Sequence, residues 1–117
     1  MNKKKAILFL IEDEDYFNNN RLIKLKKLLI KKNLRIVKQM QMPIIVCYQN
    51  KEDGTQFMRW LGAGPLYYFA EGEDKGKKLE NAFYYAYAKG YMDVLAVGSK
   101  LVDLSLDDLT EAFELLE

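Results

Sequence analysis

Residues 5–11 read KAILFLI, an unbroken apolar run that starts at a lysine and ends against the acidic residues 12–15 (EDED). Strands that are buried on both faces of a parallel sheet have continuous apolar sequences of this length, whereas half-exposed strands alternate apolar and polar residues. The run therefore predicts the first strand of the fold, at the centre of a sheet that is covered on both sides.

Strand and helix patterns alternate along the rest of the chain. Further runs with high β propensity predict strands at residues 44–48 (IIVCY), 66–70 (LYYFA) and 92–97 (MDVLAV). Helical spacing of apolar residues predicts helices at about residues 20–41, at 55–61, around 79–86 with Gly90 closing the helix, and after a capping box of Ser105 and Asp108. Residues 50–54 between two of these segments are predicted to form a turn.

This alternation favours right-handed crossovers between parallel strands. We therefore expect a single α/β domain over residues 1–117, built as a three-layer α/β/α sandwich with a mainly parallel four-stranded sheet. The first long helix is predicted to be amphipathic. Its two faces consist of leucines and of lysines: Leu22, Leu25 and Leu29 on one, and Lys24, Lys27 and Lys31 on the other. We interpret the lysine stripe as a solvated helix face.

Charge and hydropathy exclude several kinds of partner. The 18 Lys and Arg residues nearly balance the 17 Asp and Glu residues, so no global field draws the protein to nucleic acid or to an anionic membrane. The apolar run at residues 6–11 is too short for a signal peptide, and no stretch approaches the ~20 apolar residues of a membrane span. We expect a cytoplasmic protein that binds neither nucleic acid nor membrane.

The residue inventory also limits the chemistry. The chain has no histidine, which excludes Ser-His-Asp and Cys-His catalysis as well as every metal site with a histidine ligand. Its one cysteine, Cys47, lies inside an apolar run and cannot form an internal disulfide. We interpret Cys47 as a buried structural thiol.

A family resemblance becomes visible in residues 71–113, EGEDKGKKLENAFYYAYAKGYMDVLAVGSKLVDLSLDDLTEAF. The matching features are Gly72, Gly76, the helix Leu79-x-Asn81-Ala82-Phe83, Gly90-Tyr91, Gly98-Ser99 and Asp103-Leu104-Ser105. With this spacing the segment resembles, without gaps, a bacterial family of glycosyltransferase-like proteins with the nucleotide-diphospho-sugar transferase (GT-A) fold. The resemblance implies the Rossmann-like half of that fold and a nucleotide or nucleotide-sugar ligand.

The same resemblance implies that the metal site is lost. After its fourth strand the family has roughly Gly-Ser-Asp-x-Pro-x-Leu, whereas residues 98–104 here read GSKLVDL. Lys100 therefore stands where the family has its metal-binding aspartate, and an ammonium group cannot ligate a cation. Residues 12–15 crowd the loop after the first strand with carboxylates, and Ile11, Phe17 and Asn19 replace lysines of the family.

We accordingly expect no catalytic residue, no metal and no cofactor in this chain. The residues expected to remain from the family's nucleotide site are Arg21, Gly76, Lys78, Gly98, Ser99, Lys100 and Asp103. The family's domains are nearly twice as long, so we expect no acceptor pocket here and exposed apolar surface that favours a homodimer.

Three hypotheses for the function stay open. The first is a catalytically inactive transferase-like domain that acts as a binding or interaction module. The second is an active, metal-independent glycosyltransferase in which Arg21, Lys78 and Lys100 neutralise the phosphates. The third is a degenerate receiver-like signalling domain, because residues 7–15 (ILFLIEDED) are similar to the opening of receivers, although no aspartate ends the expected second or third strand.

Overall fold

The computed structural model describes residues 4–12 and 21–116. The elements along the chain are β1 (Lys5–Leu10), α1 (Arg21–Lys38), β2 (Ile44–Tyr48), the 3-10 helix η1 (Lys51–Asp53), α2 (Gly54–Leu61), β3 (Leu66–Phe69), α3 (Lys75–Ala88), β4 (Asp93–Gly98) and α4 (Leu106–Leu116). The strands form one parallel sheet in the order β3-β2-β1-β4. The predicted α/β fold class is confirmed.

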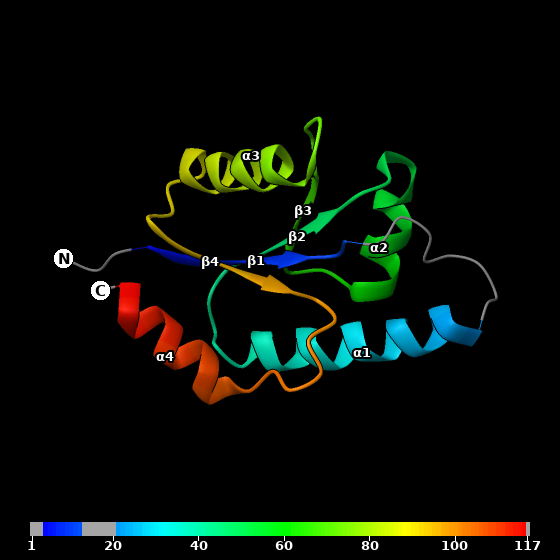
Figure 1. Cartoon of the computed structure of the whole chain (residues 1–117), viewed down its shortest axis with the longest axis horizontal. Helices are drawn as coiled ribbons and strands as arrows, with labels where there is room; N and C mark the ends of the chain where they lie inside the picture. The colour runs from blue at the N-terminus through cyan, green and yellow to red at the C-terminus, as the bar shows by residue number, and fades with distance from the viewer. Residues whose placement is uncertain (1–3, 13–20, 117) are drawn as a thin grey trace.

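Helices cover both faces of the sheet, as Figure 1 shows. Helices α1, α2 and α4 pack on one face, where their apolar side chains join those of alternate strand residues in the larger core cluster. Helix α3 covers the other face, where Ala82 and Ala86 contact the smaller cluster. The protein therefore has three layers, with the small side chains of α3 bringing this helix close to the strands.

Strand β1 occupies the position predicted for it. It pairs with β2 on one side, with Leu8 opposite Ile45, and with β4 on the other, with Leu8 opposite Ala96. Residues 6–9 of β1 are completely buried. Because successive side chains of a strand point to opposite faces, Ile7 and Phe9 enter the larger core cluster and Leu8 enters the smaller one.

The burial of α1 differs from the amphipathic pattern read from the sequence. Leu22 and Leu25 are more than half exposed, whereas the buried residues of the helix are Ile30, Asn33, Leu34 and Val37. In Figure 1 only the C-terminal half of α1 lies beneath the strands, and its N-terminal half extends beyond them. The leucines at that end therefore have no sheet to pack against.

Other details confirm or adjust the predicted boundaries. Strand β2 has the predicted limits, while β4 begins and ends one residue later than predicted. The turn expected at residues 50–54 contains η1, and the Asn50 side chain accepts a hydrogen bond from the Glu52 amide. Ser105 caps α4, because its Oγ accepts a hydrogen bond from the Asp108 amide at 3.1 Å. None of the described helices combines the length and the apolar character that a membrane crossing needs.

The lysine stripe of α1 is mostly solvated, as predicted. Lys24 and Lys31 are exposed. Lys27 is half-buried instead, and its Nζ lies 5.3 Å from the centre of the Trp60 ring. This cation–π contact joins α1 to α2.

A buried amide holds the loop between β4 and α4 against α1. The Asn33 side chain is fully buried, and its Nδ2 donates hydrogen bonds to the carbonyl oxygens of Ser99 and Leu101, each at 2.8 Å. Buried carbonyl groups need such partners because no water reaches them. One α1 side chain therefore fixes the backbone of residues 99–101.

Replacing this amide should destabilise the protein strongly. We expect Asn33→Ala to lower the free energy of unfolding by about 2–3 kcal/mol, because it leaves the buried Ser99 carbonyl without a donor and removes a second hydrogen bond to the Leu101 carbonyl. Urea unfolding followed by circular dichroism measures the change. Asn81→Ala is the matched control, since Asn81 also donates to a carbonyl, that of Glu71 at 2.9 Å, but in an exposed place. Equal losses for the two variants would contradict this role of Asn33.

Candidate ligand-binding site

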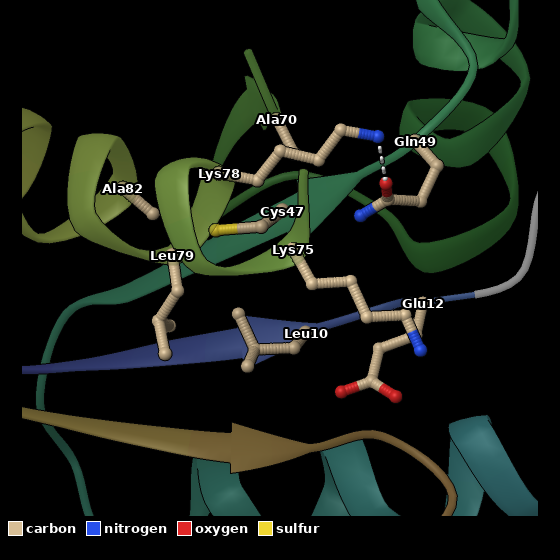
Figure 2. A pocket seen from close by; sticks show the side chains of 9 residues that line it. All are labelled: Leu10, Glu12, Cys47, Gln49, Ala70, Lys75, Lys78, Leu79 and Ala82. Carbon is tan, nitrogen blue, oxygen red and sulfur yellow. Dashed lines mark hydrogen bonds between the residues drawn. The ribbon is translucent and has the colours of Figure 1, made fainter. Parts of the chain in front are cut away.

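A pocket of about 140 Å³ lies at the carboxyl ends of β1, β2 and β3, next to the first turns of α3. Its lining consists of Leu10, Glu12, Cys47, Gln49, Ala70, Lys75, Lys78, Leu79 and Ala82. All of these side chains are drawn in Figure 2. The pocket exists here because parallel strands end at the same edge of a sheet and α3 begins beside that edge.

The pocket has an apolar interior and a polar rim. Carbon and sulfur atoms come from Leu10, Cys47 and Ala70 at the strand ends and from Leu79 and Ala82 on α3. The polar side chains come from the residues just beyond two strands and from the start of α3. Such a combination is typical of sites that hold a flat apolar group and orient it with a few polar contacts.

Lys78 connects the two sides of the rim. Its Nζ donates a hydrogen bond to Gln49 Oε1 at 2.8 Å, so the first turns of α3 are joined to the residue after β2. Figure 2 shows Lys78 reaching from the helix toward Gln49, with a dashed line for this bond. Lys75 adds a second ammonium group to the lining and Glu12 adds one carboxylate. Among the described lining residues, two ammonium groups therefore stand against one carboxylate.

The start of α3 brings the positive end of a helix dipole to the rim, next to the Asp74 carboxylate that caps the helix. Asp74 caps the helix by accepting a hydrogen bond from the Lys77 amide at 2.8 Å, and the first turn contains no acidic residue. A helix N-terminus presents free amides and the positive end of the helix dipole. With Lys75 and Lys78 in the lining, this end of the pocket suits an anionic group.

Gly72 allows the preceding loop to approach α3 closely. Its φ is +147°, and a Cβ at this position would lie 2.7 Å from the Lys78 amide nitrogen and 2.9 Å from the Lys77 carbonyl carbon. Real Cβ atoms essentially never come this near to backbone atoms. At Gly76 the nearest atom to an added Cβ is Asp74 Oδ1 at 3.4 Å, so the fold itself does not require glycine there.

Alanine substitutions at these two glycines should have opposite effects. We expect Gly72→Ala to lower the free energy of unfolding by more than about 1 kcal/mol, because its backbone conformation and the contact with α3 both oppose a side chain. Gly76→Ala lies within a helix, where alanine is favoured over glycine by about 1 kcal/mol, and should be neutral or stabilising. Thermal and urea unfolding of both variants measure the difference, and a stable Gly72→Ala protein would contradict the close approach.

Cys47 contributes a buried thiol to the pocket wall. The residue is 1% exposed, and burial raises the pKa of its thiol to about 12. The thiolate is the reactive form of cysteine, so a raised pKa makes the group unreactive near neutral pH. The burial of Cys47 and the raised pKa of its thiol both support the prediction that it is a buried structural residue.

The thiol should resist modification in the folded protein. We expect iodoacetamide at pH 8 to leave Cys47 unlabelled under native conditions and to label it fully in urea, because unfolding removes the burial that raises its pKa. Mass spectrometry after timed quenching measures labelling. Burial keeps the folded thiol protonated up to about pH 12, whereas an unfolded thiol loses its proton near its ordinary pKa of 9.0. The contribution of this group to stability should therefore decline as the pH rises above 9.0. Rapid native labelling would contradict the burial.

The residues predicted for the site fall into two groups. Lys78 lines the pocket, and Gly76 lies in the first turn of α3 beside it. Gly98 ends β4 opposite Leu10, and the Ser99 amide donates a hydrogen bond to the Leu10 carbonyl at 2.9 Å. Gly98 and Ser99 are therefore on the side of β1 that faces away from β2 and β3.

Lys100 and Asp103 lie outside the pocket lining. Lys100 is half-exposed and Asp103 is exposed in the loop between β4 and α4. Arg21 begins α1, but its side chain is outside the described residues, as are residues 13–15, Phe17 and Asn19. Within residues 4–12 and 21–116, no cluster of three or more possible metal-ligating His, Cys, Asp or Glu residues is present.

Three charged or amide side chains of the lining were not among the site residues predicted from the sequence. Gln49 and Glu12 follow strands directly or after one residue, which is the position where open α/β sheets place ligand contacts. Lys75 opens α3, where a cation meets an anionic ligand. The position after a strand could have indicated Gln49, but only the fold shows that Lys78 reaches it.

The chain is similar to known proteins in sequence and in fold. The model of a family described as uncharacterized proteins conserved in bacteria (DUF2064) matches residues 32–117. No curated protein matches the sequence. A solved structure of a presumed nucleotide-diphospho-sugar transferase from Desulfovibrio desulfuricans G20 superposes with a TM-score of 0.83 and 19% identity, covering 96% of this chain and 54% of that chain. The chain thus spans about half the length of that protein and shares its fold, which confirms the resemblance inferred from residues 71–113.

Proposed function

The chain belongs to a family of uncharacterized proteins conserved in bacteria (DUF2064), and we propose that it is a transferase-like binding module for a phosphate-bearing ligand of the nucleotide class. In this proposal it binds the ligand without catalysing group transfer. The observation that carries the proposal is the pocket at the carboxyl edge of the sheet, with Lys75 and Lys78 of α3 in its lining.

The pocket supports a nucleotide-type ligand through both of its parts. Open α/β sheets bind ligands at the carboxyl ends of their strands, and a helix N-terminus with lysines suits phosphate. The apolar interior formed by Leu10, Ala70 and Leu79 suits the flat ring of a base. At about 140 Å³ the pocket is smaller than the ~300–1,000 Å³ of sites that enclose a whole drug-sized ligand. The sugar and phosphates would therefore lie over the rim, near the two lysines.

The residue type found just after β4 supports the proposed absence of catalysis. In the transferase-like family that residues 71–113 resemble, a carboxylate after this strand holds a divalent cation that neutralises the departing diphosphate. Here the corresponding residue is Lys100, whose positive charge opposes a cation. Lys100 also lies outside the pocket lining, and it follows β4, which pairs with β1 on the side away from β2 and β3.

Ligand binding is the direct test. We expect at least one nucleoside diphosphate among those of uracil, cytosine, guanine and adenine to raise the melting temperature, by the same amount with and without Mn²⁺. Lys78→Ala should raise the Kd measured by calorimetry about tenfold, because a charge-assisted hydrogen bond to phosphate is lost. Lys89→Ala is the matched control, since Lys89 is exposed just beyond the other end of α3.

The same experiment separates the competing functions. No stabilisation by any of the diphosphates would contradict the ligand class. Stabilisation that requires Mn²⁺ would show a metal-assisted site and overturn the proposal in that respect. Release of free sugar from a nucleotide sugar, followed by chromatography, would show an active transferase or hydrolase and overturn the absence of catalysis.

A further inference from the structure

Helices α1 and α4 carry opposite charges on the same layer of the molecule. Every charged residue of α1 is Lys or Arg, and every charged residue of α4 is Asp or Glu. Both helices pack on the same face of the sheet, and Thr110 Oγ1 of α4 lies 3.9 Å from Met40 Sδ just after α1. The outer surface of this layer is therefore basic over one helix and acidic over the other.

Leucines are exposed within each charged surface. On α1, Leu25 and Leu28 are 59% and 66% exposed, and on α4, Leu115 is 82% exposed. An exposed apolar group that is surrounded by charges of one sign matches a partner surface with an apolar centre and charges of the opposite sign. Helices α1 and α4 match each other in this way, since both expose leucines and their charges are opposite. A second copy of the chain can therefore supply the partner surface.

We propose that the α1–α4 layer is the interface of a homodimer, in which α1 of each copy packs against α4 of the second copy. Figure 1 shows the exposed N-terminal half of α1 at one end of the layer and α4 at the other. In such a dimer a two-fold axis relates the two copies, so that α1 of each copy meets α4 of the other. Basic surface then meets acidic surface twice, and Leu25 and Leu28 of one copy approach Leu115 of the other. Pairing α1 with α1, by contrast, would oppose lysines to lysines at a substantial electrostatic cost.

The size and position of the layer are compatible with this arrangement. Helix α1 has 18 residues and is therefore about 27 Å long. Two such contacts related by symmetry can supply the roughly 800 Å² per partner of an ordinary interface. The candidate pocket lies with α3 at the opposite face, so the dimer leaves it open, and the dimer is independent of what the pocket binds.

Paired charge reversals test the interface. Light scattering after size exclusion should give the mass of a dimer for the full chain at tens of micromolar, weakening as salt screens the charges. Lys24→Glu with Lys31→Glu on α1, and Glu111→Lys with Glu114→Lys on α4, should each raise the dimer Kd by about tenfold or more. An equimolar mixture of the two double variants should restore the dimer, because each reversed helix then meets its complement.

Controls separate the interface from folding and from net charge. The double variant Lys51→Glu with Lys89→Glu changes the net charge by the same amount as the α1 double variant, but at positions outside both helices. It should leave the dimer unchanged. Circular dichroism checks that every variant is folded, and Leu25→Gln with Leu28→Gln tests the apolar contact without changing charge. A monomeric wild-type chain, a dimer insensitive to the reversals, a mixture that stays monomeric, or an open-ended series of oligomers would each overturn the proposed pairing.

Discussion

The burial of β1 on both faces is the constraint on which the rest of the structure depends. This strand hydrogen-bonds to β2 on one side and to β4 on the other, so all its backbone groups in the sheet have partners. Its side chains enter two cores alternately, with Phe9 in the cluster on the side of α1 and Leu8 in the cluster on the side of α3. A polar residue at either position would be buried without a partner, which explains the unbroken apolar sequence.

The location of the candidate site follows from this parallel arrangement. All four strands end at the same edge, and the chain after β3 returns to begin α3 beside that edge. Gly72 lets the connecting loop lie against the first turns of the helix, so the lysines there face the residues that follow β1 and β2. Because β1 separates β4 from β2, the pocket and the loop with Lys100 are two distinct regions of the edge. This separation is consistent with the binding module proposed above, in which the ligand contacts the pocket and not the loop with Lys100.

The two halves of α1 differ in what their apolar side chains contact. The C-terminal half of α1 buries Ile30, Leu34 and Val37 against the sheet. Its N-terminal half extends past the strands and exposes leucines among lysines. Burial of such leucines requires a partner, and the charges around them determine which partner is acceptable. In the proposed dimer, α4 of a second copy would cover these leucines, and its acidic residues would complement the lysines around them.

The sequence by itself determined the features that depend on local patterns. The run at residues 5–11, the limits of β2, the cap at Ser105 and the burial of Cys47 were all predictable, because strand and helix periodicities and caps involve neighbouring residues. The tertiary structure alone decided which residues of α1 are buried, since this depends on how far the helix extends past the sheet. It also brought Lys78 to Gln49 across 29 residues and Asn33 to Ser99 across 66. Contacts at such separations depend on the packing of whole elements, and no periodicity in the sequence encodes them.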